Sequence, residues 1–291
     1  ETDPLFDASL AKGITAIDTA YWNDKLDSSS IQNFVDLTTA QTVAGAKTFS
    51  SDLIVNGMTV GTGGGAIASN TAIGDSALYS NTTGDYNTAN GTQALYSNTT
   101  GSDNTANGSE ALKRNTTGYN NTANGVEALY SNTTGDRNTA NGADALSSNT
   151  TGNRNTANGT AALFSNTTGD YNTGIGYAAL FRSTTGDSNT ANGYRALYSN
   201  TTGSRNTALG YRADVGSSNL SNATAIGNIA TVSASNRVRI GNSSVSRIGG
   251  QVAWTNLSDG RIKENVQEAV PGLSFISQLR PVTYTLNTRK Q

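Results

Sequence analysis

Residues Asn121 to Arg137 read Asn-Thr-Ala-Asn-Gly-Val-Glu-Ala-Leu-Tyr-Ser-Asn-Thr-Thr-Gly-Asp-Arg, and close variants of this 17-residue stretch follow one another along the middle of the chain. The pair Asn-Thr recurs nine times at this spacing, beginning at Asn70, Asn87, Asn104, Asn121, Asn138, Asn155, Asn172, Asn189 and Asn206. Thr224 to Gly227 continue the phase as a degenerate tenth copy. A fixed period of this kind indicates structural repeats that stack on one another.

The residues of the repeat predict short strands joined by tight turns. Each copy has two glycines, such as Gly91 and Gly101, that we expect to turn the chain with positive φ. The neighbouring Asn-Thr pairs favour turns through local side-chain hydrogen bonds. Thr-Ala and Ala-Leu-Tyr-Ser predict two short extended stretches, because asparagine, threonine and glycine are poor helix formers. We therefore predict a β-solenoid whose coils stack about 4.8 Å apart.

The apolar content of each coil is small, with two alanines, one leucine and often one tyrosine or phenylalanine. We expect this to be too little to enclose a core within one thin solenoid, so that other copies of the chain must complete it. A homotrimer with a shared central axis would bury the small faces and leave few exposed edges. The predicted fold class is all-β: a trimeric parallel β-solenoid, or β-roll, fibre with a short helical N-terminal region and a small α+β C-terminal end.

Changes in composition divide the chain into four segments. We expect an N-terminal attachment or collar region at 1–60, the repeat shaft at 61–232, closing strands at 233–257 and a truncated chaperone-like segment at 258–291. Ile14, Ile17 and Tyr21 recur at helical spacing, which predicts a short amphipathic helix in the first segment. Leu53 to Val55 predict a strand at its end.

The composition favours an extracellular structural protein over an enzyme. The 291 residues include no histidine and no cysteine, 14% are charged and the net charge is −2. Without histidine, the commonest general base and the His-ligated zinc sites are excluded. We expect no nucleic-acid partner, because there is no basic run, and no membrane span, because no apolar stretch approaches about 18 residues.

We also expect no cofactor and no bound metal. The repeats lack the glycine- and aspartate-rich pattern of calcium-binding β-rolls. Acidic residues recur at one corner as Asp85, Asp136, Asp170 and Asp187, but Ser102, Tyr119, Asn153 and Ser204 interrupt this column.

The repeats resemble the head domains of trimeric autotransporter adhesins, whose units carry an Ala-Ile-Gly signature. Ala72-Ile73-Gly74 and Ala225-Ile226-Gly227 match it directly. Six units place asparagine at the isoleucine position: Asn90, Asn107, Asn124, Asn141, Asn158 and Asn192. The resemblance implies that these side chains point inward and form an axial ladder, hydrogen-bonded to the coils above and below or across the trimer axis.

Three interpretations of this asparagine ladder remain open. It can fix chain register and trimer state, as a single buried asparagine does in coiled coils. It can bind water or ions in an axial channel. Alternatively, the orientation is reversed and the side chains are exposed.

A column of aromatic residues follows the leucine of most repeats: Tyr79, Tyr96, Tyr130, Phe164, Phe181 and Tyr198, with Lys113 and Ser147 interrupting it. One interpretation is packing in the core or between chains. The other is surface recognition, in which Tyr79, Tyr96, Tyr130 and Tyr198 stack against sugars of a receptor.

Two segments outside the repeats resemble bacteriophage proteins. Residues 37–49 are similar to sequences common in tail fibres, and residues 257–265 and 272–284 resemble the start of the endosialidase-type intramolecular chaperone family. That resemblance implies a self-cleaving pair, with Ser258 as nucleophile, Lys263 as base and the cut between Leu257 and Ser258. Lysine acts as such a base when burial depresses its pKa. The segment is shorter than the family's domain, so a structural remnant is the alternative.

Together these features predict a non-enzymatic, homotrimeric extracellular fibre that mediates attachment. The leading version is a tail fibre of a phage or phage-derived device, on the virion tail. The alternative is a bacterial surface adhesin or appendage filament, and a precursor with one-time Ser-Lys cleavage in cis is a second alternative. Expected partners are two further copies of the chain, an end-to-end or baseplate partner, and a glycan or protein receptor on a cell surface.

Overall fold

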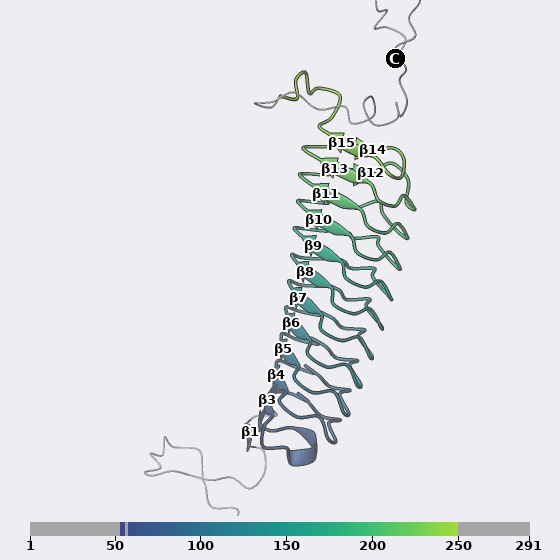
Figure 1. Ribbon diagram of the computed structural model, residues 1–291. Coiled ribbons are helices and arrows are strands. Elements are labelled where there is room, and N and C mark those ends of the chain that lie inside the picture. Colours follow the sequence, from purple (N-terminus) through teal and green to yellow (C-terminus); the bar gives the residue numbers. More distant parts are fainter. Residues whose placement is uncertain (1–52, 56–57, 250–291) are drawn as a thin grey trace, which may run out of the picture. The chain divides into compact units, whose positions relative to one another are not determined.

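The computed structural model describes residues 53–55 and 58–249, and the structural statements below concern these residues. They form a parallel β-solenoid of about 10 turns, which confirms the predicted fold class for the single chain. In Figure 1 the strands of successive coils lie one above the other on one side of the stack.

The main sheet has 13 strands in the order β1-β2-β3-β4-β5-β6-β7-β8-β9-β10-β11-β13-β15. A first group consists of β1 Leu53–Val55, β2 Met58–Gly61, β3 Thr71–Gly74, β4 Thr88–Asn90, β5 Thr105–Asn107, β6 Thr122–Asn124 and β7 Thr139–Asn141. A second consists of β8 Thr156–Asn158, β9 Thr173–Ile175, β10 Thr190–Asn192, β11 Thr207–Leu209, β13 Thr224–Ile226 and β15 Val238–Ile240. A two-stranded sheet pairs β12 Asp214–Val215 with β14 Thr231–Val232, and a 3-10 helix, η3, spans Gly64–Ala66.

From β3 onward the strands pair in parallel and in register, so each residue lies beside its own copy in the next coil. Thr122 pairs with Thr139, and Asn124 pairs with Asn141. The backbone bonds repeat with this register: the amide of Thr122 donates to the oxygen of Asn138 at 2.8 Å. The 17-residue period of the sequence is therefore the circumference of one coil.

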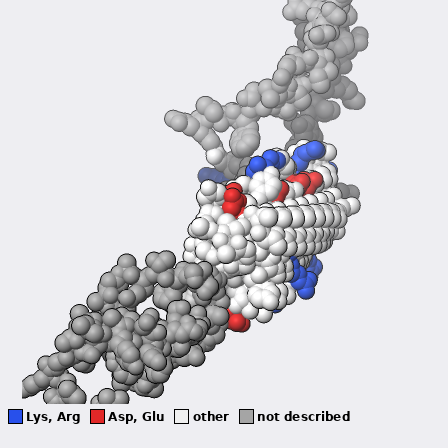
Figure 2. All heavy atoms as spheres, turned by 90° about the horizontal axis from the view of Figure 1, so that it is seen from below, with Lys and Arg blue, Asp and Glu red and all other residues white. Residues whose placement is uncertain are grey.

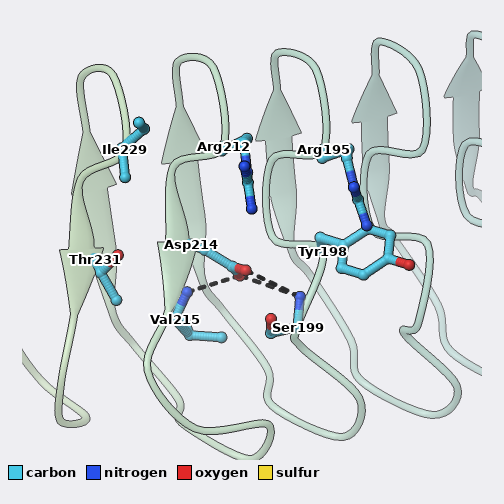
Figure 3. Close-up of a pocket in the computed structure, with 8 residues that line it drawn as sticks. All are labelled: Arg195, Tyr198, Ser199, Arg212, Asp214, Val215, Ile229 and Thr231. Carbon is cyan, nitrogen blue, oxygen red and sulfur yellow. Dashed lines mark hydrogen bonds between the residues drawn. The ribbon is translucent and has the colours of Figure 1, made fainter.

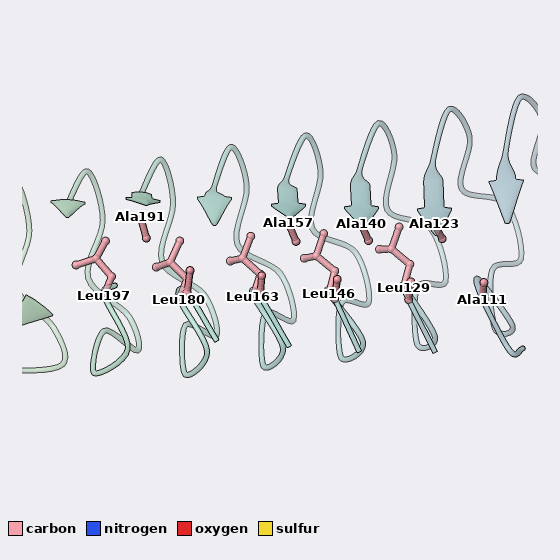
Figure 4. Packing of buried hydrophobic residues seen from close by; sticks show 14 of the residues in the cluster. Ala111, Ala123, Leu129, Ala140, Leu146, Ala157, Leu163, Leu180, Ala191 and Leu197 are labelled. Atoms are coloured by element: carbon pink, nitrogen blue, oxygen red, sulfur yellow. The ribbon is translucent and has the colours of Figure 1, made fainter. Parts of the chain in front are cut away.

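The interior contains alanines from the strands and leucines from the opposite side of the coil, which point toward one another (Figure 4). Ala89, Ala94 and Leu95 are 0% exposed, as are their counterparts in the next coils. Leucines and alanines meet across the coil, since a Cβ built at Gly174, the glycine replacing one strand alanine, would lie 3.4 Å from Cγ of Leu163. Each buried leucine stabilises the fold by about 1.5–3 kcal/mol.

The expectation that other chains must complete this interior is wrong. Two columns of buried asparagines fill the space that the few apolar residues leave. One column contains Asn70, Asn87, Asn104, Asn121, Asn138, Asn155, Asn172, Asn189 and Asn206; the other contains Asn81, Asn98, Asn115, Asn132, Asn149, Asn166 and Asn200. Apolar side chains alone are too few to fill the coil, but an amide whose donors and acceptors are paired is a stable interior residue.

Both buried columns are hydrogen-bonded along the stack. Nδ2 of Asn132 donates to Oδ1 of Asn115 at 2.8 Å and to the oxygen of Gly135 at 2.9 Å. Nδ2 of Asn121 donates to the oxygen of Gly135 at 2.8 Å, and Oδ1 of Asn121 accepts from the amide of Asn138 at 2.9 Å. The asparagines of the second column thus bond to the glycine three residues later in the same coil and to the asparagines of the neighbouring coils.

The second predicted strand, Ala-Leu-Tyr-Ser, is wrong for the regular repeats. In the coil that begins at Asn87, Gln93 and Leu95 adopt positive φ values of 56° and 52°, so this side is a series of turns. Left-handed backbone costs about 1–2 kcal/mol per residue. The burial of the leucine and a 3.0 Å bond from its amide to the oxygen of Ala111 offset that cost.

The two glycines of each repeat have different roles. Gly91 has φ +139°, as expected, but Gly101 does not adopt positive φ, so that expectation is wrong for the second glycine. At Gly101 the reason is space, because a Cβ would clash with the carbonyl oxygen of Gly118 in the next coil. Close stacking of backbones therefore requires glycine even where the dihedral angle does not.

The two ends of the stack differ from its middle. β1 pairs antiparallel with β2, and β2 pairs antiparallel with β3, so the predicted strand at Leu53–Val55 is confirmed. At the other end, β15 is a strand within the predicted closing segment 233–257, whereas Arg247 to Gly249 of that segment form no strand. Arg239 of β15 pairs with the buried Ala225 of β13, and no described strand stacks beyond it.

One coil breaks the second asparagine column. Ser183 stands where the coils on either side have Asn166 and Asn200, and Oγ of Ser183 and Oδ1 of Asn166 are buried without a hydrogen-bond partner. Serine lacks the side-chain amide that, in the regular coils, donates to the asparagine of the preceding coil. This gap is a local weak point in an otherwise continuous ladder.

Replacing Asn132 by alanine is expected to destabilise the coil stack by about 1–3 kcal/mol, because Oδ1 of Asn115 loses its donor and Nδ2 of Asn149 loses an acceptor. Denaturant unfolding followed by circular dichroism measures this. Thr134→Ala, at an exposed position of the same coil, is the control and should leave the midpoint unchanged. Equal midpoints for the two variants would contradict a role for the buried ladder.

Ser183→Asn is expected to raise stability by about 1 kcal/mol, because the new amide can donate to Oδ1 of Asn166 and accept from Nδ2 of Asn200. The same denaturation experiment measures the gain. Ser165→Asn makes the identical change on the outside of the neighbouring coil and should have no such effect. A lower midpoint for Ser183→Asn would show that the gap is needed for packing.

Candidate functional site

The asparagine column singled out from the sequence lies on the outer face of the main sheet. Ala106, between Thr105 and Asn107, takes the interior position, and strand alternation places Asn107 on the opposite face. An axial position between several chains stays a prediction.

The central members of this outer column form a ladder. Nδ2 of Asn107 donates to Oδ1 of Asn124 at 2.8 Å, Asn124 donates to Asn141 at 2.7 Å, and Asn141 donates to Asn158 at 2.8 Å. Asn90 begins the run next to Ile73. Asn192 lies apart, between Ile175 and Leu209, so it has no amide neighbour in the column.

The outer face of the main sheet carries no charged residue from β3 to β13. It presents a column of threonines beside the column of asparagine, isoleucine and leucine. Ile73, Ile175 and Leu209 of the second column are 37%, 39% and 49% exposed. Figure 2 shows that charged side chains gather in separate groups and leave a broad surface of regular uncharged rows. A flat, uncharged sheet face with exposed aliphatic side chains is suited to packing against another protein surface.

The aromatic column lies on the outside of the coil, on the turn that follows the leucine. Tyr79 is 65% exposed and stacks on Tyr96 with ring centroids 5.4 Å apart. Phe164, Phe181 and Tyr198 continue the column with centroid separations of 5.2 and 5.4 Å. Cations cover the Tyr130 ring, with Arg114 at 5.0 Å and Lys113 at 5.5 Å. These rings do not take part in the core of the single coil.

A second stacked column, Tyr177, Tyr194 and Tyr211, was not singled out from the sequence. Its ring centroids are 5.4 and 5.2 Å apart, and all three side chains are exposed. The signal was present, because each tyrosine directly follows the first glycine of its repeat at the constant 17-residue spacing.

The corner column that contains the aspartates has a structural role. Oδ1 of Asp136 accepts from the amide of Tyr119 at 2.9 Å, and Oδ1 of Asp187 accepts from the amide of Asp170 at 2.8 Å. Asn153 and Ser204 make the equivalent bond, so aspartate, asparagine and serine interchange there as hydrogen-bond acceptors. In the described residues no group of three or more acidic side chains is placed to hold a metal ion.

A pocket of about 510 Å³ lies at the place where the aromatic column ends (Figure 3). It is lined by Arg195, Tyr198, Ser199, Arg212, Asp214, Val215, Ile229 and Thr231. Among these residues, Tyr198 is the one that the sequence predicts for surface recognition. Tyr79, Tyr96 and Tyr130 lie in coils farther along the stack and do not line it.

A change of backbone conformation creates this pocket. At Asp214 and Val215 the second side of the coil becomes a strand, β12, and the left-handed φ of the leucine position is lost. Val215 then occupies the core at 3% exposure, and Asp214 takes the outer position. No aromatic ring continues the column beyond Tyr198, so a hollow opens beside it.

Asp214 is held in the pocket by backbone donors. Its carboxylate accepts from the amide of Ser199 at 3.1 Å and from the amide of Val215 at 2.8 Å. Burial nevertheless raises the pKa of Asp214 above its ordinary value, against the effect of these hydrogen bonds and of the Arg212 charge. The sequence contained no signal for this residue, since its position depends on the switch from turn to strand.

Ser258, Lys263 and the bond after Leu257 lie outside the described residues, as do the predicted helix near Tyr21 and the segment 37–49. In the described residues no helix is long and apolar enough to cross a membrane.

No known protein family and no curated protein matches the chain. Among solved structures, the chain is similar to the collagen-binding domain of the Yersinia adhesin YadA, with 18% sequence identity. The match covers 60% of this chain and 77% of that chain, and its TM-score is 0.35. At this TM-score no conclusion about the present chain rests on the likeness.

Asp214→Asn is expected to gain stability relative to the unchanged chain as the pH rises from about 4 to 7. A raised pKa in the folded state means that folding is favoured most below the ordinary aspartate pKa of about 3.9 and is weakened as Asp214 ionises. Thermal unfolding at a series of pH values measures the difference. Asp103→Asn, at an exposed corner, is the matched control, and a pH-independent difference for Asp214→Asn would contradict the burial effect.

Proposed function

We propose that this chain forms the repetitive part of a homotrimeric extracellular fibre that mediates attachment. The observation that carries the proposal is the outer face of the main sheet, which is uncharged over successive coils and exposes Ile73, Ile175 and Leu209. Self-association through this face would remove those side chains from water. Each coil keeps its own closed interior, and the copies associate through their surfaces.

The in-register stack also favours a structural role. Hydrogen bonds link every coil to the next through the main sheet, the turn backbone and the buried asparagines. Such a stack can hold exposed columns, including the stacked tyrosines, at a regular spacing for contact with a receptor. An extracellular surface is the setting in which a fibre of this kind would meet a receptor.

The number three comes from the resemblance of the Ala-Ile-Gly units to trimeric adhesin heads. The tail-fibre version of the proposal comes from residues 37–49 and 257–284, which the structure does not describe. The bacterial surface adhesin stays the alternative, and self-cleavage by Ser258 and Lys263 stays a prediction about a precursor.

Asn124→Arg is expected to abolish self-association, because it places a charge on the uncharged face in the middle of the outer ladder. Sedimentation velocity of the full chain should give three times 30.0 kDa for the unchanged protein and a mass near 30.0 kDa for the variant. Asn120→Arg makes the same change at an exposed corner and should leave the trimer intact.

Two outcomes would overturn this proposal. A folded monomer formed by the unchanged chain would remove the homotrimer. Equal masses for Asn124→Arg and the unchanged trimer would show that another surface joins the chains.

A further inference from the structure

The pocket at the end of the aromatic column combines two arginines, Arg195 and Arg212, with hydrogen-bonding groups. Arg195 lies over the Tyr198 ring, with its guanidinium carbon 4.0 Å from the ring centroid, and also interacts with Tyr194. Arg212, one coil further on, reaches the same hollow (Figure 3). The coil spacing therefore presents two guanidinium groups along one wall.

Arg212 is available to a ligand. In the described part of the chain its guanidinium donates no hydrogen bond and forms no ion pair, and its charge acts on Asp214 only through space. Arg195, in contrast, is held against the two tyrosines. A guanidinium with free donors at the rim of a pocket is suited to bind a carboxylate through two parallel hydrogen bonds.

The rest of the pocket offers groups that a bare anion would not use. The Asp214 carboxylate has lone pairs beyond those that accept from Ser199 and Val215, and Ser199 and Thr231 add hydroxyl groups. Ile229 is 48% exposed and gives one apolar surface. A sugar supplies hydroxyl donors for the carboxylate and an apolar ring face for the isoleucine, whereas an aspartate or glutamate side chain of a peptide supplies neither.

The charge and the size of the pocket restrict the class of ligand further. The negative charge of Asp214 opposes a doubly charged phosphate more than a singly charged carboxylate. A volume of about 510 Å³ falls within the range of about 300–1,000 Å³ typical of small-molecule sites. One carboxylated monosaccharide unit is a ligand of this charge and size.

We propose that this pocket binds a carboxylated sugar unit of a cell-surface glycan, with Arg212 pairing with the sugar carboxylate and Asp214 accepting hydrogen bonds from sugar hydroxyls. The inference rests on the proposed attachment function and names its receptor class. Two members of the exposed column Tyr177, Tyr194 and Tyr211 directly precede the pocket arginines Arg195 and Arg212 in the chain. The column therefore offers further contact surface to neighbouring sugar units.

Saturation-transfer NMR of the full chain with free N-acetylneuraminic acid and free glucuronic acid tests the proposal. Transfer to at least one of these acids is expected, with none to glucose. Arg212→Gln should weaken the binding by roughly tenfold or more, because a charge-assisted bidentate contact is lost. Arg137→Gln, which removes an exposed arginine that lies over Tyr119 in another coil, is the matched control and should bind as the unchanged chain does.

Four outcomes would overturn the inference: no transfer to either acid, equal binding by Arg212→Gln, equal binding of glucose, or binding of acetate or phosphate as strong as that of the sugars. If a pentaglutamate peptide binds more strongly than the acidic sugars, the ligand is an acidic protein segment and the glycan assignment is wrong. Sedimentation of the same samples separates this test from the test of assembly. If the chain is a trimer but binds no acidic sugar, the pocket assignment is wrong and the homotrimer stands. If the chain is a monomer that binds the sugar, the homotrimer is wrong and the pocket assignment stands.

Discussion

In-register stacking at a 17-residue interval is the constraint on which the rest of the structure depends. It places every side chain beside the equivalent side chain of the next coil, so the residues within each column must interact favourably with one another. Asparagine meets this condition because its amide donates to one neighbour and accepts from the other, as Asn115, Asn132 and Asn149 do in the interior. Leucine and alanine meet it by burial, and tyrosine meets it by ring stacking.

The same constraint explains how polar residues can form much of a core. A column of amides is satisfied only if no member is missing. Ser183 shows the consequence, because Oγ of Ser183 and Oδ1 of Asn166 in the preceding coil are both buried without a partner. The left-handed backbone of the leucines is likewise tolerated because it recurs with an inter-coil hydrogen bond in each repeat. The fold therefore depends on the continuity of each column more than on the hydrophobicity of any single coil.

Function is best sought where the columns stop or change. The outer face of the main sheet alternates between a run of asparagines and isolated aliphatic residues, which suits association with other copies without a continuous hydrophobic stripe. The aromatic column ends at Tyr198, and the turn-to-strand switch at Asp214 opens a polar pocket there. The regular stack thus gains a distinct pocket where Asp214 and Val215 form a strand instead of a turn.

The amino-acid sequence by itself determined the solenoid, its coil length, the first strand of each repeat and the closing strand at Val238–Ile240, because periodicity and strand alternation are properties of the chain alone. It could not show that Asn87 and Asn98 fill the interior while Asn90 lies outside, since all three residues are asparagines. Only the path of the backbone around the coil decides which of them point inward. The sequence also could not place Arg195, Arg212 and Asp214 around one pocket. Tertiary structure decided this, because residues 17 or more positions apart become neighbours only once the coils stack, and a side chain's face depends on whether its coil turns or extends at that point.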